Sequence, residues 1–181
     1  MTVPDISVYS NVWDIPLLFF AILTVDVCVL FLTRYFPGFF GAPLNRWYTK
    51  FGLSAVLSDV LVILIGFLIA RYIYTIWFKP TMGWNPAAFV GLLVLVQLIH
   101  DIFFYLGIIL PLPKGHNEMI DVFKAYAESA GAKILAGDAG LMIASAAVAF
   151  AYKAIPVHAM AAMSIGVSYA LTYILYTPPK Y

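Results

Sequence analysis

The chain has 181 residues, of which 64% are hydrophobic and only 10% charged, whereas soluble domains carry about 25% charged residues. Its formal net charge of +1 excludes the basic surface that nucleic-acid binding requires, and its one cysteine, Cys28, excludes an internal disulfide. The composition therefore predicts an integral membrane protein in which residues 1–181 form a single transmembrane domain.

Five apolar runs are long enough to cross a bilayer, whose hydrocarbon core of about 30 Å requires about 20 residues of helix. Proline or glycine residues stand at their boundaries, as is typical of helix ends. The runs cover approximately residues 15–35, 52–78, 87–110, 134–154 and 157–176. The sequence thus predicts an all-α, polytopic transmembrane helix bundle.

The segment HNEMIDVFKAYAESAG, residues 116–131, has a different pattern. One side of the helix that its spacing predicts is apolar and carries Met119, Phe123, Tyr126 and Ala130. The other side carries Glu118, Asp121, Lys124 and Glu128. This amphipathic helix is too polar to span, so we expect it at the membrane surface between the third and fourth spans, with a solvated hairpin arm as the alternative.

Lysine and arginine residues are unevenly shared between the two sides of a five-span arrangement. Loops rich in these residues face the cytoplasm. One side carries Arg34, Arg46, Lys50, Lys114, Lys124, Lys133 and Lys180, and the other carries Arg71, Lys79 and Lys153. We therefore expect the N-terminus outside, and the C-terminus and the amphipathic helix in the cytoplasm.

Several polar side chains lie within the apolar runs, where a charge at the bilayer centre costs roughly 2.5 to 3.5 kcal/mol by insertion scales. Asp26 lies midway along the first run. At a rise of about 1.5 Å per residue, the others fall at one depth in the cytoplasmic half. They are Asp59, Gln97, His100, Asp101 and Asp138. These five residues form a polar cluster, and together with Asp26 they are the six candidate residues of a pathway for an ion or a proton.

The charges in this cluster require partners. Arg34 and Lys133 stand at the cytoplasmic ends of the first and fourth runs and are long enough to reach it. Gln97 and Asp101 share a helix face at i,i+4. His100 and Asp101 point about 100° apart on a helix, so we expect them to contact other helices rather than each other.

Small residues recur every fourth position in three of the runs, a spacing that lets helix backbones approach closely. These candidate packing residues are Gly66 and Ala70 in the second run, Gly140 and Ala144 in the fourth, and Gly166 in the fifth. They predict packing within the chain, or alternatively between the copies of a homo-oligomer.

Motifs of known chemistry are missing from the sequence. No nucleotide-binding glycine pattern occurs, and His100, His116 and His158 are too few and too scattered for a metal centre. No Ser-His pair has a recognisable catalytic context. We therefore expect no enzymatic activity, no cofactor and no metal.

Three stretches resemble a group of uncharacterised multi-pass membrane proteins of large DNA viruses of algae and protists. They are PKGHNEMIDVFKAYAESAGAKILAGDAG, LSDVLVILIGFLIARYIY and LIHDIFFYLG, which together cover the second to fourth runs. The resemblance implies an internal membrane of the virion, or a host membrane, and carries no catalytic residues.

Two functions agree with these features, and an intramembrane enzyme is kept as a third alternative. The leading hypothesis is a viral membrane protein of structural or assembly type, whose polar cluster organises the bundle. The alternative is a channel or transporter that conducts protons or cations through the cluster. A dry, fully hydrogen-bonded cluster would favour the structural function, whereas a water-lined path would favour transport.

Overall fold

The computed structural model describes residues 2–179, apart from the side chains of residues 37–41 and 130, and every regular element in it is helical. Lys180, which was counted in the charge balance, lies outside this range. The helices are α1 (Asp14–Tyr35), α2 (Pro37–Phe51), α3 (Leu53–Ile73), α4 (Lys79–Met82), α5 (Pro86–Phe104), α6 (Glu118–Ala130), α7 (Lys133–Ala154) and α8 (Val157–Ile174). Two π-helical turns, η1 (Tyr74–Phe78) and η2 (Tyr105–Ile109), extend α3 and α5.

Five helical segments are long and apolar enough to cross a membrane, which confirms the predicted bundle of five spans. They are Asp14–Tyr35, Leu53–Met82, Pro86–Ile109, Lys133–Ala154 and Val157–Ile174. Their outward faces are apolar too, with Leu61, Phe103 and Ile165 among the exposed side chains. Helices that are apolar all round are typical of membrane spans, so the structure is compatible with an integral membrane protein.

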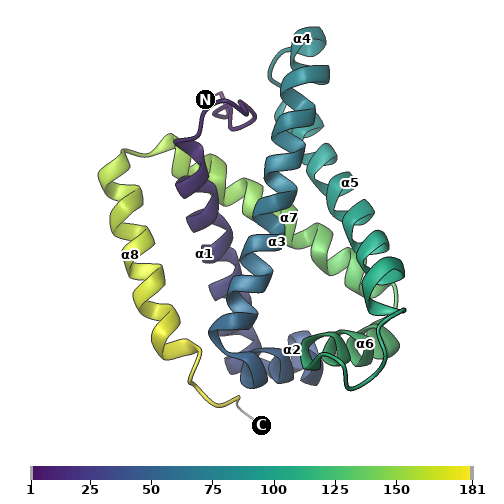
Figure 1. Ribbon diagram of the computed structural model, residues 1–181. Coiled ribbons are helices and arrows are strands. Elements are labelled where there is room, and N and C mark those ends of the chain that lie inside the picture. Colours follow the sequence, from purple (N-terminus) through teal and green to yellow (C-terminus); the bar gives the residue numbers. More distant parts are fainter. Residues whose placement is uncertain (1, 180–181) are drawn as a thin grey trace.

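The spans form a ring with one helix outside it (Figure 1). Around the ring, α1 packs on α3, α3 on α5, α5 on α7, and α7 on α1, while α8 packs on the outer side of α1. Each ring helix places a fully buried apolar side chain at the centre. These side chains include Ile22, Phe67, Phe89 and Met142. The core therefore lies inside the ring, and α8 contributes little to it.

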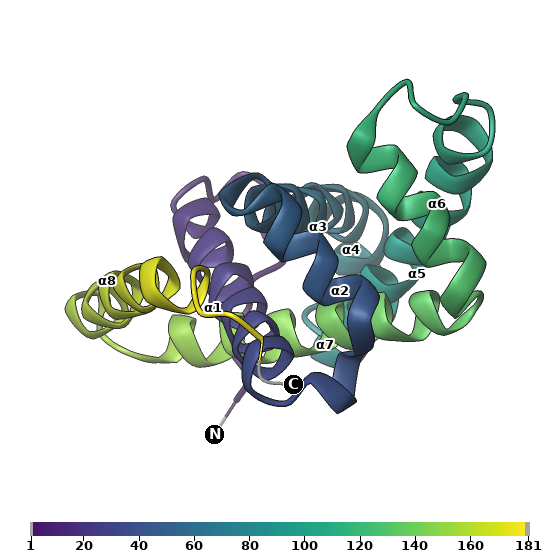
Figure 2. The same cartoon turned by 90° about the horizontal axis from the view of Figure 1, so that it is seen from below.

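Two helices cross one end of the ring, where α2 and α6 lie next to each other (Figures 1 and 2). The amphipathic prediction is confirmed for α6, because Met119 and Phe123 pack against the core while Glu118 and Glu128 are exposed. The side chain of Ala130 lies outside the described part. Asn117 starts α6 by accepting hydrogen bonds from the backbone N–H groups of residues 119 and 120.

The sequence did not predict α2, because its prolines and glycines were interpreted only as the end of the first span. Pro37 lies at the first turn of the helix, where proline needs no hydrogen-bond partner. The apolar side chains of Trp47 and Tyr48 are buried against the bundle. Tertiary packing thus stabilises a helix that local sequence preference disfavours. We call the end of the bundle that carries α2 and α6 the α6 end.

Candidate functional site

The α6 end of the bundle is hollow. A partly open cavity of about 900 Å³ lies between the ring helices and the two crossing helices, and we call it the chamber. Its wall is formed by α1, α2, α3, α5, η2, α6 and α7. Most of the wall is aliphatic or aromatic, with contributions from Val62, Ile63, Phe104, Ile109 and Leu135. The ring helices therefore pack closely only toward the opposite end.

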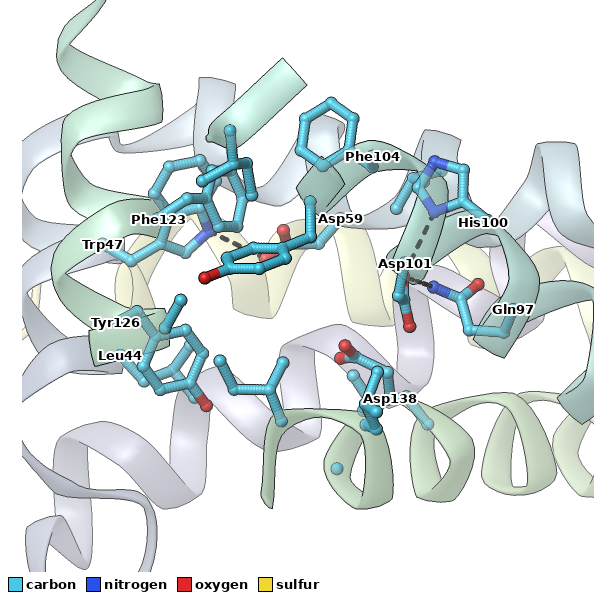
Figure 3. A pocket seen from close by; sticks show the side chains of 18 of the residues that line it. Leu44, Trp47, Asp59, Gln97, His100, Asp101, Phe104, Phe123, Tyr126 and Asp138 are labelled. Atoms are coloured by element: carbon cyan, nitrogen blue, oxygen red, sulfur yellow. Dashed lines mark hydrogen bonds and ion pairs between the residues drawn. The ribbon is translucent and has the colours of Figure 1, made fainter. Parts of the chain in front are cut away.

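Each ring helix contributes one carboxylate to the chamber wall. They are Asp26 from α1, Asp59 from α3, Asp101 from α5 and Asp138 from α7. Gln97 and His100 line the same cavity, and Figure 3 shows Asp59, Asp101 and Asp138 around one space. The structure thus brings together all six residues that the sequence proposed as pathway candidates, although their role in conduction stays a prediction.

Helix α2 supplies hydrogen-bond donors to two of these carboxylates. The Tyr48 hydroxyl donates to Asp26 Oδ1 over 2.8 Å. The Trp47 indole N–H donates to Asp59 Oδ2 over 2.9 Å, as Figure 3 shows. Sequence reasoning did not identify either aromatic residue as a site residue. Tyr126 of α6, which also lines the chamber, was assigned only to an apolar helix face.

Asp101 accepts a hydrogen bond from a neighbour on its own helix. Gln97 Nε2 donates to Asp101 Oδ1 over 2.7 Å, as their i,i+4 spacing predicts. His100 Nδ1 lies 3.1 Å from the same oxygen, so the expectation that His100 and Asp101 do not contact each other is wrong. The two Cβ directions diverge, but side-chain rotation brings the imidazole back to the carboxylate, and the ring stacks on Phe104 at 5.7 Å.

Two carboxylate oxygens in the chamber wall are buried and accept no hydrogen bond from the described residues. They are Asp26 Oδ2 and Asp101 Oδ2. Asp26 as a whole is only 4% exposed. Leaving a buried polar atom unpaired costs about 1 to 3 kcal/mol, and more when the group is charged. The cluster is therefore not a fully satisfied structural network.

The predicted charge partners do not reach the cluster. Arg34 does not line the chamber. It donates to Thr49 Oγ1 over 2.8 Å, to Asn45 Oδ1 over 3.2 Å and to the Leu175 carbonyl over 3.3 Å. Lys133 is exposed at the start of α7. Within residues 2–179, no lysine or arginine lines the chamber, so the assignment of these two cations as partners is wrong.

The chamber raises the pKa values of two tyrosines that lie outside the spans. Burial raises the pKa of Tyr48 well above its ordinary value of 10, and the charges of Asp26 and Asp59 raise it further. Burial also raises the pKa of Tyr126, with further contributions from Asp138 and Asp59. Both phenols therefore stay protonated and can donate hydrogen bonds to the chamber.

Only one of the predicted glycines lies in a tight contact. A Cβ added to Gly66 would lie 3.2 Å from Met142 Cε and 3.6 Å from Gln97 Oε1. A Cβ on Gly140 or Gly166 would meet nothing within 4 Å, so the expected close packing does not occur there. Gly140 instead lines the chamber. Among the predicted packing alanines, Ala70 is fully buried and Ala144 half-buried, and a homo-oligomer stays a prediction.

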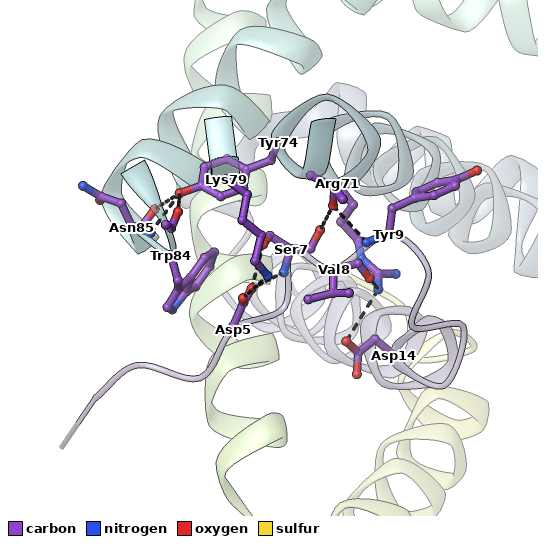
Figure 4. A network of polar contacts seen from close by, with 12 residues as sticks. Asp5, Ser7, Val8, Tyr9, Asp14, Arg71, Tyr74, Lys79, Trp84 and Asn85 are labelled. Atoms are coloured by element: carbon purple, nitrogen blue, oxygen red, sulfur yellow. Dashed lines mark hydrogen bonds and ion pairs between the residues drawn. The ribbon is translucent and has the colours of Figure 1, made fainter. Parts of the chain in front are cut away.

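A second polar cluster closes the opposite end of the bundle (Figure 4). Arg71 of α3 is fully buried, lies 3.5 Å from Asp14 and donates to the Asn11 carbonyl over 2.8 Å. Lys153 of α7 also forms an ion pair with Asp14. These contacts tie α1, α3 and α7 to each other and to the segment before α1.

That N-terminal segment lies over the helix ends. Asp5 pairs with Lys79 at 2.6 Å, and the Trp84 indole N–H donates to the Val3 carbonyl over 2.9 Å (Figure 4). Thr75 Oγ1 donates to the Ser7 carbonyl over 2.8 Å. The closed end and the hollow chamber thus lie at opposite ends of the molecule.

Comparisons of the chain with protein-family models, with curated proteins and with solved structures found no match. The resemblance to viral membrane proteins stays a prediction.

Proposed function

We propose that this membrane protein binds protons or small cations in the chamber and carries them across the membrane. The observation on which the proposal depends is the convergence of four carboxylates, one from each ring helix, on a cavity without a lysine or arginine in its described wall. Two of their oxygens, Asp26 Oδ2 and Asp101 Oδ2, have no hydrogen-bond partner within the part of the chain that the structure describes. A bound cation or proton would remove both the mutual repulsion and the unpaired acceptors.

The electrostatic argument depends on the low polarity of the surroundings. Charged groups within a membrane are costly and are normally paired, and where they are not they mark ion or proton pathways. At an effective dielectric constant of 20, two unit charges 4 Å apart interact with about 4 kcal/mol. A cation among several carboxylates therefore gains attraction that the empty chamber lacks.

A structural or assembly role was the leading hypothesis from the sequence, and it accounts for fewer of the contacts. It explains why Tyr48 and Trp47 donate to Asp26 and Asp59, since such bonds fix α2 against the ring. The structural role gives no reason for four acidic side chains around a cavity. A structural network stabilises a fold only when its polar atoms are hydrogen-bonded, and the cavity leaves some of these oxygens without such a bond. The cation-binding function explains both features.

The shape of the chamber favours a carrier over an open pore. All residues that line it belong to the α6 end or to the middle of the ring. Toward the opposite end the ring is filled by Leu18 and Phe89, and Arg71 is held there by Asp14. Transport would therefore require a rearrangement of the ring, and its rate would saturate with cation concentration.

The proposal is tested by flux measurements on purified protein in liposomes, with a pH-sensitive dye and with sodium or potassium gradients. We expect saturable flux that falls by at least about tenfold in Asp59→Asn and in Asp101→Asn. Glu128→Gln is the matched control, because Glu128 is an exposed acid on α6 outside the chamber wall. Absence of proton and cation flux in the wild type, with both chamber variants less stable than the wild type, would support the structural role instead.

A further inference from the structure

The chamber is much larger than a proton or a metal ion requires. Its volume of about 900 Å³ equals that of about 30 water molecules at roughly 30 Å³ each. It lies at the upper end of the range for small-molecule pockets, which is about 300 to 1,000 Å³. A site built only for an inorganic ion would not need such a space between its carboxylates.

The wall of the chamber is chemically divided. Apolar surface lies between its acidic groups. This surface is formed by Val62, Ile63, Leu135 and Leu141, and it offers water no hydrogen bonds. Pockets of this kind bind organic molecules, with the apolar wall holding the body of the ligand and a few polar groups fixing its orientation. The chamber therefore suits a molecule that has both an apolar body and a charged group.

Aromatic rings stand beside the carboxylates. Trp47 and Phe123 pack together with ring centroids 4.7 Å apart, and both line the chamber near Asp59 (Figure 3). Phe104 stands next to His100 on the α5 side. Cationic nitrogen is attracted to aromatic faces, and rings combined with acids are the usual recognition elements for quaternary and protonated amines.

One buried carboxylate provides an independent indication of a missing ligand. Asp26 is 4% exposed and lines the chamber, yet its Oδ2 has no partner, although Oδ1 accepts from Tyr48. A buried carboxylate oxygen in this position is suited to the positive charge of an ammonium group that enters the chamber from the α6 end.

We propose that the ligand of the chamber is an amphipathic organic ammonium, with one positively charged nitrogen among the carboxylates and an apolar body against the aliphatic and aromatic wall. This inference rests on the proposed cation-binding function and names the class of cation. Asp26, Asp59 and Asp101 surround the charged nitrogen. Trp47 and Phe123 contact its substituents, and the surface around Leu135 receives the apolar body.

Binding of three probes to the protein in lipid nanodiscs tests this assignment, with empty nanodiscs as the blank. Trimethyl(1-adamantyl)ammonium carries both charge and apolar body, tetramethylammonium carries the charge alone, and 1-tert-butyladamantane is the neutral isostere of the first. We expect the first probe to bind at least about tenfold more tightly than either of the others. Equal binding of the neutral isostere, or tighter binding of tetramethylammonium, would overturn the proposal.

Two glycines provide a matched pair of variants that avoids the carboxylates. Gly140 lines the chamber and Gly166 on α8 does not, and both have open space where a side chain would start. We expect Gly140→Leu to weaken binding of the adamantyl probe by at least about tenfold by occupying the cavity, and Gly166→Leu to leave it unchanged. Both variants should retain the thermal stability of the wild type, and unchanged binding in Gly140→Leu would contradict the proposal.

Different experimental results would contradict the organic ligand and the proposed carrier function. Proton or sodium flux that depends on Asp59 and Asp101, without binding of the adamantyl probe, would remove the organic ligand and leave the carrier function. Absence of flux together with absence of binding by any probe would remove both.

Discussion

Single side chains from separate helices determine the chemistry of the chamber. Asp59 lies on α3, but its hydrogen-bond donor, Trp47, lies on α2, and the rings nearest to Trp47 include Phe123 of α6. The indole is 4% exposed. This one residue therefore joins the acidic cluster to both helices that cross the α6 end.

Replacing Trp47 by phenylalanine should destabilise the protein through the lost donor. The variant keeps an aromatic ring against Phe123 but leaves Asp59 Oδ2 without its hydrogen bond, which costs about 1 to 3 kcal/mol. Chemical unfolding in detergent micelles measures this difference. Trp77→Phe is the control, because Trp77 is 64% exposed and should tolerate the change within about 0.5 kcal/mol. Equal stability of the two variants would show that the Trp47–Asp59 bond is unimportant.

Asp5 gives the N-terminal segment a dependence on pH. Partial burial raises its pKa, but hydrogen bonds from Lys79 and Ser7 outweigh this effect, and the pKa lies below its ordinary value of 3.8. A carboxylate with a lowered pKa stabilises the folded state above its ordinary pKa, and this contribution is lost as the pH falls through the lowered value.

We therefore expect the N-terminal segment to detach in acid. Hydrogen exchange of residues 5–9, followed by mass spectrometry, should be slow near pH 6 and should rise, after correction for intrinsic exchange rates, below about pH 4. Asp5→Asn removes the charge at every pH, so its corrected exchange should be faster near pH 6 and nearly independent of pH. A wild-type profile as flat as that of the variant would rule out Asp5 as the titrating group.

At the scale of elements, the ring is closed at one end and open at the other because its helices pack differently along their length. Midway along α3, Gly66 lets Met142 of α7 and Gln97 of α5 approach its backbone. Nearer the α6 end, Gly137 and Gly140 of α7 have open space beside them. The chamber begins beyond this contact between Gly66 and the Met142 side chain.

Gly66→Leu should therefore disrupt the contact between α3 and α7. Overpacking of this kind typically costs about 1 to 3 kcal/mol, because Met142 has to move and Gln97 limits the space on the other side. Gly91→Leu is the control, since a side chain at Gly91 of α5 meets nothing within 4 Å. The test is the difference in midpoint of chemical unfolding, and a Gly66→Leu variant as stable as Gly91→Leu would contradict the tight contact.

The whole molecule has a different polar cluster at each end. In the described wall of the chamber the carboxylates have no lysine or arginine beside them, whereas at the other end Asp14 lies between Arg71 and Lys153. Arg71 and Asp14 are almost completely buried, at 0% and 2% exposure. A compensated pair of this kind stabilises a closed end, whereas uncompensated acids suit the binding of a ligand.

Removal of one partner from the closed end should be strongly destabilising. Breaking a buried ion pair typically costs about 3 to 5 kcal/mol, because it leaves an unpaired charge. We expect this cost for Arg71→Met and for Asp14→Asn, and a smaller cost for the double variant than the sum of the two. Lys79→Met is the comparison, since its pair with Asp5 is partly exposed and is worth about 1 kcal/mol or less. Strict additivity in the double-mutant cycle would show that Arg71 and Asp14 do not interact.

The sequence by itself determined the number of spans, their positions to within a few residues and the amphipathic character of α6. It did so because the length and the periodicity of an apolar run are local properties of the sequence, and the thickness of the bilayer sets the length of helix that can cross it. The depth of Asp59, Gln97, His100, Asp101 and Asp138 followed from the same reasoning, because the helical rise per residue is fixed.

Only the tertiary structure decided which of these groups acquire partners. The helix over residues 37–51, the donors Trp47 and Tyr48, and the direction of Arg34 depend on contacts between distant segments. The same holds for the glycines, since Gly66 and Gly140 have similar spacing patterns but face a side chain and a cavity, respectively. The hydrophobic pattern determines which segments of the chain lie in the membrane. The rotation and tilt of each helix depend on its packing against the other helices. Rotation and tilt in turn determine whether the polar side chains form a fully hydrogen-bonded network or line a chamber.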